Sequence, residues 1–124
     1  MKEYVLLFRM DITTESAQPN AEQMQSYMTS WMKWIDDIAA KRQLAEGGNH
    51  FSKAGKLLMP KNIITDGPYT ANKESVAGYI IILAKDMDDA ISIAQKCPIL
   101  EGEGTSVEIR ETATPQGMKD VKRA

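Results

Sequence analysis

The sequence predicts an α+β fold in which a four-stranded antiparallel sheet carries two helices on one face. Apolar periodicities of strand and helix type follow the order strand, long helix, strand region, strand, helix, strand. One segment in the second half of the chain has no polar face, which is typical of a central strand covered on both sides. The length of 124 residues favours a single domain.

The composition excludes several functional classes. Fifteen Lys and Arg against 17 Asp and Glu give a net charge of −2, and nothing indicates the clustered basic surface of a nucleic-acid-binding protein. No stretch approaches the roughly 18 apolar residues of a membrane span. One Cys and one His leave none of the usual Cys/His zinc sites, so we expect neither a metal nor a cofactor. The first residues lack the apolar core of a signal peptide, and we expect a cytoplasmic protein without nucleic-acid or membrane partners.

The first third of the chain is predicted to form a strand and then a long helix. Both faces of residues 2–12 are mostly apolar, which a half-exposed strand does not show. A helix over residues 20–44 begins at Asn20, where Gln23 completes a capping box, and Gly47-Gly48 is expected to end it. Its apolar stripe comprises Met24, Tyr27, Met28, Trp31, Trp34, Ile35 and Ile38. Core packing explains the two tryptophans first, and the alternative is that they line a pocket.

The middle of the chain is predicted to contain two short extended pieces and one central strand. The pieces lie within residues 49–65 and flank a turn at residues 60–62. A second turn is expected at Asp66-Gly67-Pro68. Residues 75–84 form the clearest strand, because this run has no polar face.

The last third is predicted to contain a helix, a strand and a tail. Asp86 caps a helix over residues 87–96, and an alternating strand follows over residues 105–111. We assign residues 1–112 to one domain and residues 113–124 to a flexible C-terminal tail.

This order of elements matches a ferredoxin-like arrangement, in which right-handed crossovers place both helices on one face of the sheet. Two helices cover only that face, whereas the first and third predicted strands are apolar on both faces. Soluble monomers rarely expose such a face, and the simplest cover is the same face of a second copy, which predicts a homodimer. In these two strands, odd-numbered and even-numbered side chains point to opposite faces, and the helices can cover only one of the two sets. The odd-numbered apolar residues are Val5, Leu7, Ala77, Tyr79, Ile81 and Leu83.

The run from Thr65 to Glu74 resembles the signature of the YCII-related family, in its DGPF-type branch. Members typically read Asp-Gly-Pro-Phe, then a short Glu-containing stretch and Lys-Glu, and this chain has Asp66-Gly67-Pro68-Tyr69 and Lys73-Glu74. The resemblance covers about residues 2–112 and implies a ferredoxin-like subunit of a dimeric α+β barrel. Further motifs of this chain also resemble the family: Trp31-x-x-Trp34, Gly78-Tyr79, Asp88-Asp89-Ala90, Cys97-Pro98 and residues 107–110.

The resemblance implies a fold and no particular reaction. Some YCII-type proteins have a His–Asp pair proposed to act in catalysis, with the His near the start of the first helix, where this chain has none. Ala71 also stands where many members carry Glu. Related barrels host different chemistries and binding roles.

His50 and Asp66 are the candidates for catalysis. His50 is the only imidazole and is suited to act as a general base near neutral pH, although an exposed loop or strand-edge histidine is equally natural here. Asp66 either fixes the turn that follows it or aims a carboxylate into a pocket between subunits. Cys97 is expected to be a structural thiol, because no activating base lies nearby in the sequence.

Tyr69, Lys73 and Glu74 are candidates for ligand binding beside Asp66. Lys73 and Glu74 either line a cleft with Asp66 or form a solvated pair. Their place in the run that carries the family resemblance is what singles them out.

Arg9 and Arg110 are candidates for binding an anion. The predicted topology makes their strands neighbours and places Glu108 in the same group. This polar cluster either binds an anionic small molecule or forms an interfacial ion pair.

Two functions remain open. The first is a small-molecule-binding protein or minor enzyme with a pocket between sheet and helices. If it has chemistry, proton transfer of the isomerase or lyase type without a metal suits these residues best. The second is a non-catalytic dimeric interaction or regulatory module. A pocket lined by the candidate residues favours the first function, and a solidly packed interior favours the second.

Overall fold

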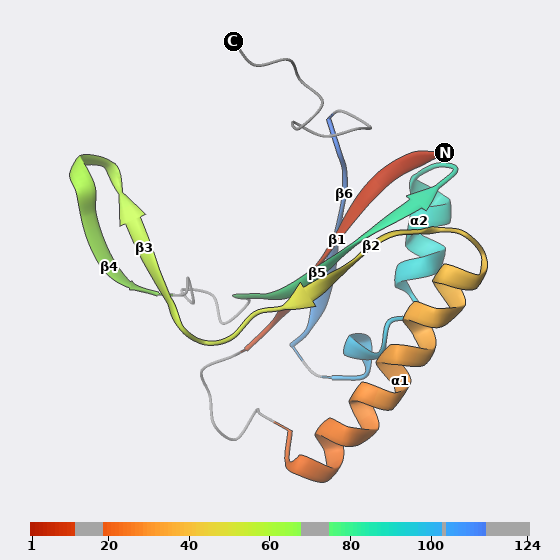
Figure 1. Ribbon diagram of the computed structural model, residues 1–124, viewed down its shortest axis with the longest axis horizontal. Coiled ribbons are helices and arrows are strands. Elements are labelled where there is room, and N and C mark those ends of the chain that lie inside the picture. Colours follow the sequence, from red (N-terminus) through yellow and green to blue (C-terminus); the bar gives the residue numbers. More distant parts are fainter. Residues whose placement is uncertain (12–18, 68–74, 103, 114–124) are drawn as a thin grey trace.

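The computed structural model describes residues 1–11, 19–67, 75–102 and 104–113. Its main sheet has four antiparallel strands in the order β2-β5-β1-β6. Both helices lie on one face of this sheet (Figure 1), so the predicted α+β, ferredoxin-like arrangement is confirmed. The bounds are β1 Lys2–Met10, α1 Ala21–Ala40, β2 Leu44–His50, β5 Ser75–Ala84, α2 Met87–Ala94 and β6 Ser106–Glu111.

The core lies between the sheet and the two helices. Successive side chains of a strand point to opposite faces, so alternation decides which residues enter this layer. From α1, Trp34 and Ile38 are buried against the sheet. The even-numbered residues of β1 and β5 that face the helices are between 0% and 2% exposed: Tyr4, Leu6, Phe8, Ile80, Ile82 and Ala84.

The opposite face of the main sheet has no helix over it, and we call it the open face. Val5 and Leu7 of β1 and Ile81 and Leu83 of β5 form its centre and are half-buried within one copy. Val5 lies directly across from Ile81 in the register of the two strands. Of the two apolar sets predicted from the sequence, the helices therefore cover the even-numbered side chains, and the odd-numbered ones lie on the open face.

Both helices begin at their predicted caps. Asn20 Oδ1 accepts a hydrogen bond from Gln23 N at 2.8 Å, and Gln23 Oε1 accepts one from Asn20 N at 2.9 Å. This reciprocal pair is the predicted capping box. Asp86 Oδ1 accepts from Asp89 N at 2.9 Å at the start of α2.

The edge strand β2 corrects the predicted end of the first helix. The helix expected to reach residue 44 ends at Ala40, and Arg42 (φ 58°) turns the chain toward β2. Gly47 and Gly48, expected to end the helix, lie inside β2. Local propensity disfavours a strand with two glycines, but hydrogen bonding to β5 overrides this preference.

The two extended pieces predicted within residues 49–65 form a hairpin that we call the arm. It is a separate two-stranded sheet that stands away from the helices (Figure 1). The predicted turn at Asp66-Gly67-Pro68 is wrong for Asp66 and Gly67, the two of its residues that the structure describes. They end the second strand of the arm, where Asp66 pairs with Lys56 and Gly67 pairs with Gly55. The arm consists of β3 (Gly55–Met59), the turn η2 (Pro60–Asn62) and β4 (Ile63–Gly67).

Candidate functional site

A cavity of about 250 Å³ lies between α1 and the sheet, beside the edge strand β2. His50 lines it from the end of β2, and its ring lies 5.3 Å from the Trp31 ring, centroid to centroid, at an angle of 51°. Asp36 and Asn49 are further polar residues of the lining. The apolar lining residues include Phe8, Ile35 and Ile80.

The Trp31 ring beside His50 belongs to a cluster of three aromatic rings. Phe8 meets the Trp31 ring edge-on at 4.7 Å, and the Trp34 ring lies 5.4 Å from the Trp31 ring. The Trp34 indole N–H donates to the Ile93 carbonyl oxygen at 3.1 Å, which ties α1 to α2. Trp34 is buried and Trp31 is half-buried, so Trp34 belongs to the core while Trp31 borders the cavity.

The backbone of β2 positions His50 because Gly48 brings β2 close to β5. Gly48 has a φ of +62°, and a Cβ there would lie 1.7 Å from the carbonyl oxygen of Tyr79. The backbone N–H of His50 donates to Asn49 Oδ1 at 2.8 Å. Gly47 and Gly48 border the cavity and have no side chains to fill it.

The cavity suits a small planar molecule with a polar substituent. Aromatic side chains bind flat rings through stacked or edge-on contacts, and an apolar wall with a few placed polar groups is typical of ligand sites. Imidazole both accepts and donates protons near neutral pH. His50 is therefore equipped to hydrogen-bond such a molecule or to exchange a proton with it.

Arg9, Glu108 and Arg110 form the predicted polar cluster, which lies on the open face. Arg9 donates to Glu108 Oε1 from Nη2 at 2.8 Å and from Nε at 3.1 Å, and Arg110 Nη1 lies 3.4 Å from Glu108 Oε2. Toward the opposite edge, the Tyr79 hydroxyl donates to Glu46 Oε1 at 2.6 Å, and this hydrogen bond raises the pKa of Tyr79. Charged groups therefore border the apolar centre of the open face.

Replacing Glu108 with glutamine should make the stability of the protein less sensitive to acid. The hydrogen bond from Arg9 lowers the pKa of Glu108 below its ordinary value of 4.5. A carboxyl group whose pKa is lower in the folded state stabilises the fold above its unfolded pKa, and this contribution is lost as the pH falls through the folded pKa. Urea unfolding at pH 7 and pH 3 should therefore show a smaller difference for Glu108→Gln than for the wild type.

The control for this measurement is Glu101→Gln, at an exposed carboxylate in the turn η3 (Pro98–Glu101). It should leave the difference between the two pH values as in the wild type. Equal differences for the wild type and Glu108→Gln would contradict the assignment.

Asp66, the second catalytic candidate, lies on the arm. Its Oδ1 accepts from Lys56 Nζ at 2.7 Å, and its side chain is 96% exposed. It is not among the residues lining the cavity beside β2, so the cavity does not bring Asp66 together with His50. The place of Asp66 in a strand contradicts the turn role, and the role in a pocket between subunits stays a prediction.

The ligand-binding candidates Tyr69, Lys73 and Glu74 lie outside the residues that the structure describes. The same is true of Pro68 in the predicted turn and of residues 114–124 in the predicted tail. Their roles stay predictions.

Cys97 is a buried structural thiol and should be unreactive in the folded protein. It is 2% exposed, and burial raises the pKa of its thiol from 9.0 to about 12. This change lowers the thiolate fraction at pH 8 about a thousandfold. Alkylation by iodoacetamide, followed by mass spectrometry, should be slower by at least about that factor in the native protein than in concentrated urea. Comparable rates in the two conditions would contradict the burial of this thiol.

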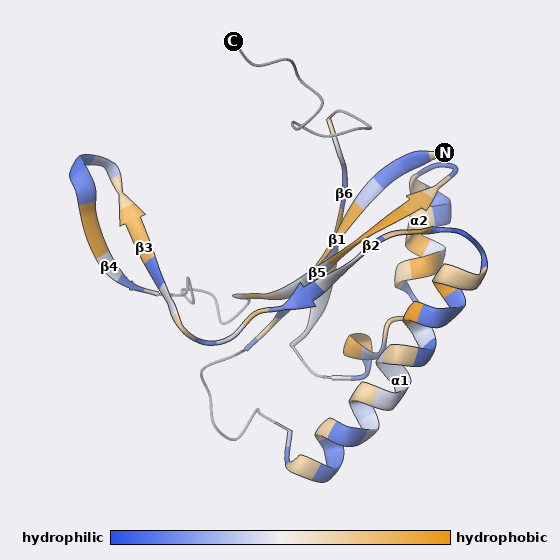
Figure 2. Ribbon diagram, in the orientation of Figure 1, coloured by the Kyte–Doolittle hydropathy of each residue, from blue (hydrophilic) through white to orange (hydrophobic). Residues whose placement is uncertain are grey.

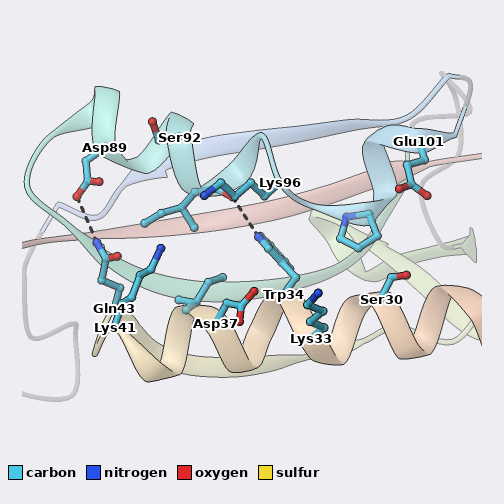
Figure 3. A pocket seen from close by; sticks show the side chains of 13 residues that line it. Ser30, Lys33, Trp34, Asp37, Lys41, Gln43, Asp89, Ser92, Lys96 and Glu101 are labelled. Carbon is cyan, nitrogen blue, oxygen red and sulfur yellow. Dashed lines mark hydrogen bonds between the residues drawn. The ribbon is translucent and has the colours of Figure 1, made fainter.

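A second depression, of about 380 Å³, lies between α1 and α2 (Figure 3). Asp89 is already engaged there, because its Oδ2 accepts from Gln43 Nε2 at 3.2 Å and from Lys85 N at 2.9 Å. The lining has no imidazole and no net charge to select a ligand, so the cavity beside β2 is the better candidate. The charged lining residues are Lys33, Lys41 and Lys96 against Asp37, Asp89 and Glu101.

The described residues form neither a metal cluster nor a membrane-spanning helix. Among them, no group of three His, Cys, Asp or Glu side chains is placed to hold a metal ion. No helix in the described ranges is both long enough and apolar enough to cross a membrane.

Sequence reasoning left Trp31 and Trp34 open between the core and a pocket and did not separate the two. The structure places Trp34 in the core and Trp31 at the cavity. Asp36 and Asn49 carry no sequence signal, because only the packing of α1 against β2 brings them to the cavity.

The comparison with curated proteins gives no match. A sequence model of the YCII-related domain matches residues 5–113. This range contains both helices, the arm and the residues that line the cavity. The chain therefore belongs to the YCII-related family.

Proposed function

We propose that the protein is a homodimer that binds a small planar molecule in the cavity beside β2, with His50 as the polar contact. The observation that carries this proposal is the His50 ring, 5.3 Å from Trp31, in a cavity of about 250 Å³. If binding leads to a reaction, His50 accepts and returns a proton, in chemistry of the isomerase or lyase type.

A thermal-shift screen of flat carboxylate and phenolic compounds tests the ligand. We expect such compounds to raise the melting temperature of the wild type. His50→Ala and Trp31→Ala should each weaken binding of a hit at least about tenfold, because a hydrogen bond or a ring contact is lost. Asp66→Ala, on the exposed arm, is the matched control and should bind as the wild type does. Unchanged binding by His50→Ala would exclude this cavity as the site.

The open face supports the homodimer. Its centre of Val5, Leu7, Ile81 and Leu83 is apolar, and charged groups lie along its borders. In a dimer with a twofold axis, the open faces of the two copies would pack against each other, as in a dimeric α+β barrel. The charged groups would then lie at the rim of the interface. Light scattering at micromolar concentration should give twice the chain mass of 13.8 kDa, and a species of 13.8 kDa would contradict the dimer.

Within the YCII-related family, the DGPF-type branch fits the run that starts at Asp66. A Cβ at Gly67 of this run would lie 3.0 Å from the backbone of Lys56. A larger residue at this position would press β4 away from β3 at the base of the arm.

A non-catalytic dimeric interaction or regulatory module is the alternative function. The apolar open face favours it, because such a face serves association whether or not the cavity is used. A persistent dimer that no compound in the screen stabilises would favour this alternative over ligand binding.

A further inference from the structure

The arm carries apolar side chains that the described part of the chain leaves exposed. Leu58 and Ile64, directly across from each other on β3 and β4, are 70% and 65% exposed. The next pair toward the turn, Met59 and Ile63, is 46% and 50% exposed. Figure 2 shows hydrophobic stretches on both strands of the arm. An isolated two-stranded hairpin is marginal in water, so a hairpin with this surface needs a partner.

The arm stands where a second copy on the open face would meet it. Figure 1 shows the arm extending away from the helices, toward the side of the sheet that they leave uncovered. Phe51 lies between β2 and the arm, and its ring is 6.0 Å from the Tyr79 ring. The apolar surface therefore continues from the open face toward the arm through Phe51.

The charge of the arm favours a second copy as the occupant. The arm carries Lys56 and Lys61 against Asp66, a net charge of +1 in a chain of net charge −2. The remainder of the chain therefore carries a net charge of −3. The arm of one copy is attracted to the body of another, and a twofold axis lets both arms make the same contact in a closed dimer.

We propose that the arm packs against a second copy of this chain that is seated on the open face, with Leu58 and Ile64 in the contact. The inference rests on the homodimer proposed above. It adds that the arm supplies part of the affinity between the two copies.

Sedimentation velocity over a concentration series tests the arm contact. Leu58→Thr and Ile64→Thr remove apolar surface and place a residue of high strand propensity at exposed positions. We expect each substitution to raise the dimer dissociation constant about 10- to 100-fold. Leu100→Thr is the matched control, because Leu100 is also an exposed leucine, at 43%. It lies in η3, which contacts α1 and is therefore on the helix side of the sheet, away from the open face. The control should change the dissociation constant by less than about threefold.

A photo-crosslinking amino acid at position 58 identifies the occupant. Irradiation of the purified protein should give a covalent dimer, and mass spectrometry should map the link to the second copy. A dimeric wild type with unchanged dissociation constants in both threonine variants, and no covalent dimer from position 58, would overturn the arm contact and leave the sheet-face dimer standing. A wild type that stays at 13.8 kDa at every concentration would overturn both, while ligand binding in the cavity of one copy is tested separately by the screen.

Discussion

Replacing Trp34 with alanine should lower the free energy of unfolding by about 3 to 5 kcal/mol. Trp34 is 5% exposed, and its ring lies 5.9 Å from the Phe8 ring in the layer between α1 and the sheet. The substitution opens a void in this layer and removes the hydrogen bond to the Ile93 carbonyl oxygen. Urea unfolding followed by circular dichroism measures the loss.

Trp31→Ala is the matched variant, because the two tryptophans lie three residues apart on the same helix. Trp31 is half-buried and borders the cavity, so its removal should cost only about 1 to 2 kcal/mol of stability. Trp34→Phe, which keeps a ring but loses the indole N–H, should also cost about 1 to 2 kcal/mol. Equal losses for Trp31→Ala and Trp34→Ala would refute the division between a core tryptophan and a cavity tryptophan.

Replacing Gly48 with alanine should destabilise the protein by about 3 kcal/mol or more. The left-handed conformation, with a φ of +62°, costs a residue with a Cβ about 1 to 2 kcal/mol. The added Cβ would also overlap the Tyr79 carbonyl oxygen at 1.7 Å, so β2 must move away from β5. Because His50 is two residues further along β2, the variant should also lose ligand-induced stabilisation.

Gly47→Ala separates this effect from a general cost of substituting glycine in β2. A Cβ at Gly47 meets no atom within 4 Å, and its φ is not in the left-handed region. This substitution should change the free energy of unfolding by less than about 0.5 kcal/mol. Similar melting temperatures for the two alanine variants would show that the close approach at Gly48 does not limit stability.

The central strands and the helix starts are predictable because their signals are local. Residues 75–84 have no polar face, which is typical of a central strand, and β5 lies between β2 and β1 in the sheet. Asn20 and Asp86 satisfy backbone N–H groups within three residues of themselves, so their role as caps needs no distant partner.

The edge strand β2 is not predictable in the same way. The residues from Leu44 to His50 include two glycines and no β-branched residue, and the hydrogen bonds that make them a strand come from β5. Arg42 takes a left-handed conformation without being a glycine, so the end of α1 carries no sequence signal either.

Some features of the candidate site are visible in the sequence, and others depend on the tertiary structure. The chemistry of His50 and of the Arg9–Glu108–Arg110 cluster is visible in the sequence, because the residue types and the expected strand neighbours suffice. The Trp31 wall beside His50 depends on how α1 crosses β2, and the pairing of Asp66 with Lys56 depends on the register of the arm.

The order of residues alone shows which faces of β1 and β5 are apolar, where the helices begin and that the chain has a single histidine. Three features come from the folded chain: which apolar face the helices cover, the pairing of β2 with β5, and the separate sheet of the arm. The reason is that periodicity and capping act over a few neighbouring residues, whereas strand pairing and cavity formation depend on contacts between residues distant in the chain.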